Sequence, residues 1–169
     1  MLLETKEDLL LDQLRDLYSV ETQIEVAIPI LVDQATAPAL RDFLAACFEE
    51  TEGQIVRIQQ ICGMLGVSAR GPRCLGVAGL LQEMEDTMRR STRGPMLDAV
   101  IIACLRRVTH YEMAVYGSAA WYATELEQAP IAELLCSSLE EEQAADKRLA
   151  RIVEEELTEQ PIQEGVLAA

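Results

Sequence analysis

The sequence predicts an all-α protein in which four long helices pack as a bundle and one short helix links the second to the third. Half of the 169 residues are hydrophobic, yet aromatic residues make up only 4%, and such aliphatic compositions are typical of helical bundles. Apolar residues also recur every three to four positions along most of the chain, which is the period of an amphipathic helix. The length is that of a single domain.

The first predicted helix runs from about Lys6 to Ala35. Leucine and isoleucine repeat along it with three-to-four spacing, and the position where this series should continue is occupied by Glu21. Pro29 lies inside the helix and is expected to kink it, because proline lacks the backbone donor that a helix needs.

The second predicted helix runs from about Ala39 to Leu65. It follows Thr36, whose side chain can cap a helix, and Pro38, which is tolerated in a first turn. Gly66 is expected to end this helix, since glycine is common just past a helix C-terminus.

Three further helices are predicted after a loop at 66–75. A shorter one spans about Val77–Arg90 and can carry the chain from one end of the bundle to the other. The last two long helices run over about Met96–Glu127 and Pro130–Leu157, where apolar residues again repeat with helical spacing. Two long helices, a crossover helix and two long helices, in that order, are the ferritin-like way of connecting a bundle.

The single domain is expected to cover residues 1–157, because 158–169 contain Pro161 and show no period, as in a disordered or peripheral tail. A net charge of −15 argues against nucleic acid or an anionic membrane as a ligand. The chain contains no run of about 18 apolar residues, which is the length needed to span a membrane. Its acidic start lacks the pattern of a signal peptide, so we expect a cytoplasmic protein. Among the five cysteines, Cys74 follows a Gly-Pro loop and is expected to be the most exposed.

Each long helix carries a glutamate on or beside its apolar face. At about 100° per residue, Glu21, Glu112 and Glu142 fall near the middle of that face. On the second helix Glu50 lies at the edge of the face, whereas its acidic neighbours point further away from it. Polar residues one turn after Glu50 and Glu142 are also predicted to point inward. The complete set of predicted inward polar positions is Glu21, Glu50, Gln54, Glu112, Glu142 and Asp146.

Buried carboxylates on four helices would be costly unless something neutralised them. One glutamate at a helix edge usually extends its head to water, but four at a similar depth are hard to explain in that way. An unpaired buried charge costs several kcal/mol, and a domain is held together by roughly 5–15 kcal/mol. The nearby basic residues that are predicted on outer faces are Arg106, Arg107, Lys147 and Arg148. We therefore expect two divalent cations, and oxygen-rich ligands favour Fe or Mn, with Mg also possible.

The predicted site contains no histidine. Dimetal sites in bundles usually include Glu-x-x-His motifs, but the only histidine, His110, is predicted to face solvent. An outward histidine could instead mark a phosphotransfer bundle, but this chain lacks the lysine that such modules usually place shortly after it. The expected site is therefore an all-oxygen carboxylate cluster.

At these positions the chain resembles the bacterial YciE/YciF (DUF892) family. The matching segments are Leu14–Glu21, Glu49–Gln54, Arg73-Cys74 ahead of Gly79-Leu80, His110–Gly117 and Leu139–Asp146. The resemblance implies a rubrerythrin-like bundle, usually dimeric, that is linked to bacterial stress responses and carries a dimetal centre. The chain departs from relatives at Thr109 and Ala78, where glutamate is often found, and each change removes a possible ligand.

Two functions follow from these observations. The first is a stress-associated dimetal carboxylate protein that acts on peroxide, O₂ or iron, with a small-molecule oxidant as its partner. In this scheme Glu21 and Glu112 bridge the two metal ions, and Glu50 and Glu142 are terminal ligands. Asp146 and Gln54 complete or orient the ligand shell. The alternative is a non-enzymatic structural or interaction protein, a homodimer with a vestigial metal site. The sequence leaves open which of the two applies and whether the protein is an enzyme.

Overall fold

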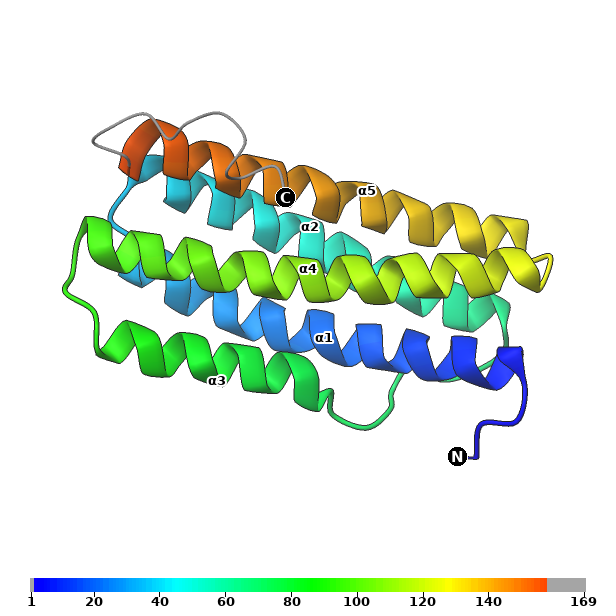
Figure 1. The fold of residues 1–169 in the computed structure, drawn as a ribbon. Helices are drawn as coiled ribbons and strands as arrows, with labels where there is room; N and C mark the ends of the chain where they lie inside the picture. The colour runs from blue at the N-terminus through cyan, green and yellow to red at the C-terminus, as the bar shows by residue number, and fades with distance from the viewer. Residues whose placement is uncertain (1, 158–169) are drawn as a thin grey trace.

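The structure, a computed structural model, describes residues 2–157, and these residues contain helices and no strands. The helices are α1 (Lys6–Gln34), α2 (Pro38–Met64), α3 (Leu75–Arg89), α4 (Pro95–Glu125) and α5 (Ala129–Ile152), followed by one turn of π-helix at Val153–Leu157. The prediction of an all-α chain with a shorter third helix is confirmed (Figure 1). The predicted tail at 158–169 lies outside the described residues.

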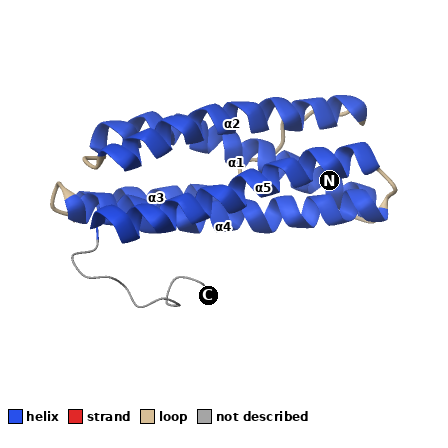
Figure 2. Cartoon of the chain, turned by 90° about the horizontal axis from the view of Figure 1, so that it is seen from above, coloured by secondary structure: helices blue, strands red, loops and turns tan. Residues whose placement is uncertain are grey.

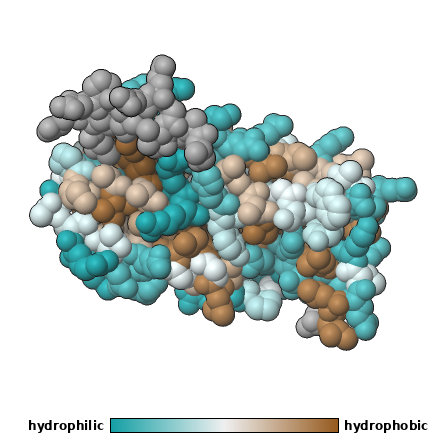
Figure 3. Space-filling model, viewed as in Figure 1, coloured by the Kyte–Doolittle hydropathy of each residue, from teal (hydrophilic) through white to brown (hydrophobic). Residues whose placement is uncertain are grey.

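The four long helices pack around a common core. Helix α1 packs on α2 and α4, and α5 packs on the same two helices, so that the four close into a ring. Helix α3 lies outside this ring against α1 and α4, and Figures 1 and 2 show all five helices aligned along one long direction. Within residues 2–157, no helix is both long and apolar enough to cross a membrane. The face in Figure 3 is largely hydrophilic with scattered apolar patches.

Helix ends are fixed by local and by distant groups. Thr5 and Asp8 form a capping box at the start of α1, in which each side chain accepts the other residue's backbone N–H, at 3.1 and 3.0 Å. The prediction that the Thr36 side chain caps α2 is wrong, because the N-cap residue is Ala37 and no side chain caps the helix there. The carboxylate of Asp98 on α4, which is buried, accepts the backbone N–H groups of Thr36 at 2.7 Å and Ala37 at 3.0 Å, and it also accepts the Thr36 hydroxyl.

Gly66 and Pro29 were predicted to affect the course of α2 and α1. Gly66 follows the end of α2 with φ +68°, a left-handed conformation that glycine adopts without strain. Pro29 lies inside α1, and the helix continues past it to Gln34.

Cys74 is buried, so the expectation that it would be the most exposed cysteine is wrong. Its backbone N–H donates to Ser19 Oγ at 2.8 Å, and its Sγ lies 3.1 Å from Tyr111 Oη. The Gly-Pro loop does reach the surface, but Cys74, at the N-cap of α3, contacts Ser19 of α1. Cys136 is exposed instead.

The core consists of two apolar clusters with polar side chains between them. On α1, Leu17 belongs to one cluster and Ile24 to the other; on α4, Tyr116 and Val108 are divided in the same way. Buried polar side chains fall between the clusters, and we call four of them, Glu21, Gln54, Glu112 and Glu142, the polar layer.

Candidate functional site

The polar layer takes one side chain from each long helix. Glu21 comes from α1, Gln54 from α2, Glu112 from α4 and Glu142 from α5, and their exposed fractions are only 0%, 1%, 4% and 7%. On each helix, apolar residues further along the same face pack into the two clusters. The helical period therefore carries the polar side chain to the same depth of the core as its neighbours.

The carboxyl groups of the polar layer hydrogen-bond to one another and to two further side chains. Glu112 bonds to both Glu21 and Glu142 through their carboxyl groups. Gln54 Nε2 donates to Glu142 Oε1 at 2.8 Å, and Tyr116 Oη donates to Glu21 Oε1 at 2.6 Å. Glu21 Oε2 is buried and has no hydrogen-bond partner.

Burial changes the acidity of these groups. Desolvation, together with the nearby Glu142 carboxyl, raises the pKa of Glu21 and of Glu112 well above the ordinary glutamate value. Burial raises the pKa of Glu142 to about 7, although the hydrogen bond from Gln54 opposes this rise. Hydrogen-bonded carboxyl groups of this kind are stable when protons, or a cation in their place, neutralise part of their charge.

Asp146 does not join the polar layer. Its carboxylate accepts hydrogen bonds from Arg106 Nε at 2.7 Å and Nη2 at 3.2 Å, and it lies 3.2 Å from Nε2 of His110. The guanidinium of Arg106 holds the pKa of Asp146 below its usual value. His110 is exposed, as predicted, but it faces this carboxylate at the surface.

Glu50 lies at the edge of the site and is already paired. Its Oε2 accepts a hydrogen bond from Nη2 of Arg148 at 2.6 Å, and the Arg148 guanidinium lies 5.1 Å from the centre of the Phe43 ring. Arg106 and Arg148, predicted on outer faces, are 25% and 37% exposed, and their guanidinium groups reach back to Asp146 and Glu50. Helical rotation places the Cα atom, whereas an arginine is long enough to bend back along the bundle and reach a carboxylate there.

Two functional contacts were not predicted from the sequence. Arg57 forms a two-pronged ion pair with Glu141 at 2.8 and 2.9 Å and also donates to Ser138 Oγ at 2.6 Å. Gln54 Nε2 donates to Glu141 Oε2 at 3.2 Å, so this surface pair is connected to the polar layer. Arg57 follows Gln54 by three residues, a spacing that places two side chains on one helix face and could have identified it.

A small cavity, which we call the inner cavity, adjoins the polar layer. Its volume is about 20 Å³, enough for one water-sized occupant. The polar side chains that line it are Cys47, Glu50, Thr51, Gln54, Thr109, Glu112 and Glu142. Burial and the neighbouring carboxylates raise the pKa of the Cys47 thiol well above the usual value. Within residues 2–157, no three His, Cys, Asp or Glu side chains stand in an arrangement that would by itself hold a metal ion.

The sequence profile of the family described as "Domain of unknown function (DUF892)" matches residues 5–161. The chain belongs to the DUF892 family. Protein YciF of Escherichia coli (strain K12) is 34% identical to it over 150 residues, which cover 88% of this chain and 90% of YciF.

Two solved structures agree with this DUF892 assignment. "YcfI, a putative structural protein from Rhodopseudomonas palustris" has a TM-score of 0.85 and 39% identity, over 87% of this chain and 94% of that one. The structure of the E. coli stress protein YciF has a TM-score of 0.84 and 34% identity, over 89% and 95% of the two chains. The resemblance to YciE/YciF in the sequence motifs is thereby confirmed.

The donor set of this DUF892 chain suits one cation better than two. Glu21, Glu112 and Glu142 offer three carboxyl groups, and Glu21 Oε2 lacks a partner, so a single hard cation would find oxygen ligands. A second cation would need Glu50 and Asp146, whose charges arginines already neutralise. The carboxyl groups would also have to turn from one another toward the ion.

Proposed function

We propose that this protein is a stress-associated member of the DUF892 family, ferritin-like in its helix connections, whose buried glutamates bind a divalent transition-metal ion. One observation carries the proposal: Glu21, Glu112 and Glu142 bring three carboxyl groups together in the core. The arginines near this layer pair with Glu50 and with other surface acids instead. The link to stress comes from the description of the relative YciF as a stress protein.

Physical chemistry supports a cation at this place. Burying three acidic groups side by side is unfavourable, and protons alone neutralise them less well as the pH rises. A divalent cation would neutralise two charges at once and give Glu21 Oε2 the partner that it lacks. Oxygen ligands suit Fe²⁺ or Mn²⁺, with Mg²⁺ as a harder alternative.

Each residue has a distinct part in this proposal. Glu21, Glu112 and Glu142 are the ligands; Gln54 orients Glu142, and Tyr116 orients Glu21 through the hydrogen bonds already described. A redox-active ion bound there would supply the chemistry needed to act on peroxide, O₂ or iron. Occupancy by two ions would require Glu50 and Asp146 to leave their arginines.

The test is metal analysis of protein purified without chelator, followed by titration with Mn²⁺ and with Fe²⁺ under anaerobic conditions. Glu21→Gln and Glu142→Gln should lower metal content and abolish the metal-dependent rise in melting temperature. Glutamine has the shape of a neutral carboxyl group, so both variants should fold. Glu140→Gln, at an exposed position of α5, removes the same charge away from the site and serves as the control. Unchanged metal content and unchanged metal-dependent melting in both site variants would refute the proposal.

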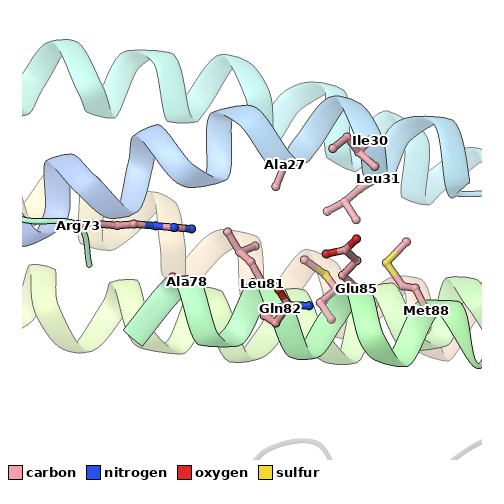
Figure 4. A pocket seen from close by; sticks show the side chains of 10 residues that line it. Ala27, Ile30, Leu31, Arg73, Ala78, Leu81, Gln82, Glu85 and Met88 are labelled. Carbon is pink, nitrogen blue, oxygen red and sulfur yellow. The ribbon is translucent and has the colours of Figure 1, made fainter. Parts of the chain in front are cut away.

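A non-enzymatic structural role is the second candidate, and a surface groove that exposes several aliphatic side chains favours it. The groove has a volume of about 280 Å³ and lies between α1 and α3 (Figure 4). It is lined by apolar side chains, among them Ile30, which is 60% exposed, and by the polar side chains of Arg73, Gln82 and Glu85. In this proposal a second copy of the chain covers the groove in a homodimer. Ile30→Glu should then shift the sedimentation coefficient to that of a monomer, and an unchanged coefficient would count against this groove as the interface.

A further inference from the structure

A second pocket lies on the surface beside the inner cavity, and we call it the outer pocket. It has a volume of about 280 Å³ and is formed by α2, α5 and the π-helical turn. The residues that line it are Ala39, Asp42, Phe43, Ala46, Arg148, Arg151, Ile152 and Glu155. Asp42, Arg151 and Glu155 are exposed, so its rim reaches solvent.

Only a few side chains separate the outer pocket from the inner cavity. Phe43 lines both spaces, Arg148 lines the outer pocket, and Glu50 lines the inner cavity. Arg148 and Glu50 meet across this boundary in the 2.6 Å ion pair, and the guanidinium also lies over the Phe43 ring. One ion pair and one ring therefore lie between the outer pocket and the inner cavity, which Glu112 and Glu142 line.

The closing ion pair is weakly held. The side chains of Arg148 and Glu50 are 37% and 32% exposed, and ion pairs of such exposure contribute little because water screens them. Arg148 Nε is buried without a hydrogen-bond partner, so the closed position leaves one donor unsatisfied. Moving the guanidinium into the outer pocket would hydrate that donor. Other sides of the layer are closed by the apolar clusters and by fully buried Glu21 and Tyr116, and the side next to Gln54 is closed by the Arg57–Glu141 ion pair.

From this geometry we infer that Arg148 and Glu50 form a gate through which divalent cations pass between the outer pocket and the polar layer. When the ion pair opens, the Glu50 carboxylate is free to accept a cation from the outer pocket and pass it to Glu142 and Glu112. Asp42 and the net charge of −15 raise the cation concentration near the entrance. The gate rests on the proposed metal site and adds a route of exchange to it.

The gate can be tested by stopped-flow absorbance with Co²⁺ alone as the probe. Arg148→Met keeps the aliphatic part of the side chain over Phe43 but removes the guanidinium. It should accelerate both Co²⁺ association and dissociation, on the order of fivefold each, because the barrier loses a partly exposed ion pair. The dissociation constant should stay within about twofold, since a gate changes rates and not equilibria. Glu50→Gln weakens the same pair but also removes the carboxylate that accepts the cation, so it should slow both Co²⁺ association and dissociation.

The matched control is Arg151→Met, which removes the same charge from the same pocket. Equal acceleration in Arg151→Met and Arg148→Met would show a general electrostatic effect and overturn the gate. Slower dissociation with unchanged association in Arg148→Met would make Arg148 a competitor for the ligand glutamates, which also overturns it. Co²⁺ binding with unchanged rates in both gate variants refutes the gate alone. Failure of the wild-type protein to bind Co²⁺ refutes the gate and the proposed metal site together.

Discussion

Replacing Glu142 by glutamine should make the stability of this protein less dependent on pH. Burial raises the pKa of Glu142 from 4.5 to about 7, so the folded protein holds a proton that the unfolded chain releases. The folded state binds more protons than the unfolded state in this interval, and stability therefore falls as pH rises. The contribution of the protonated group is complete below about pH 4.5 and is lost as pH rises through about 7.

The expected magnitude follows from the two pKa values. One pKa unit corresponds to about 1.4 kcal/mol. The Glu142 carboxyl alone should therefore lower the free energy of unfolding by roughly 2–3 kcal/mol between pH 5 and pH 8. Glutamine at this position does not titrate. Its carbonyl can still accept from Gln54, and its amide can donate to Glu112, so the hydrogen bonds of the layer are retained.

The assay is urea denaturation followed by circular dichroism at several pH values, with a chelator present to remove cations. The free energy of unfolding of Glu142→Gln should fall less between pH 5 and pH 8 than that of the wild-type protein, by the amount given above. The exposed variant Glu140→Gln should follow the wild-type protein. Parallel pH dependence in wild type and Glu142→Gln would refute the reasoning. Saturating Mn²⁺ should flatten the wild-type curve, because a ligand that binds only the folded state adds stability.

Two further predictions concern the frame that holds the site. Asp98→Ala should destabilise the protein by about 1–3 kcal/mol in urea denaturation, since it leaves the partly buried backbone donors of Thr36 and its neighbour without a partner; Asp98→Asn retains an acceptor and should cost less. Gly76→Ala places a methyl group 2.8 Å from the Tyr111 ring and should lower stability by about 1–3 kcal/mol, whereas Gly79→Ala in the same helix meets no atom within 4 Å and should raise it by about 0.5–1 kcal/mol. A loss of stability in Gly79→Ala equal to that in Gly76→Ala would contradict the steric explanation.

The helices and the buried acidic residues could be predicted from the sequence. The interruption of an apolar series by Glu21 is visible in the residue order, and helical rotation also carries Glu112 and Glu142 to the core side. The rotation applies to a regular backbone and to residues whose side chains extend straight from it. Short acidic side chains meet these conditions, so their burial followed from the pattern.

The hydrogen-bond partners of Glu50 and Asp146 could not be predicted by helical rotation. Arg148 and Arg106 start on the outer half of their helices and bend back to carboxylates on another helix. Which of several long side chains makes this contact depends on the packing angle and depth of two helices, which a single sequence does not encode locally. The contact between Asp98 and the loop before α2 likewise joins positions 61 and 62 residues apart.

The polar layer also determines how the helices slide relative to one another. A shift of one helix by a single turn, about 5.4 Å, would move its glutamate or glutamine out of the layer and against an apolar cluster. The displaced side chain would lose its hydrogen bonds, and an aliphatic residue would face the remaining carboxyl groups. One polar residue in an apolar seam fixes the alignment of coiled-coil helices in the same way. Glu21, Gln54, Glu112 and Glu142 therefore select a single alignment of the bundle, whether or not a cation is bound between them.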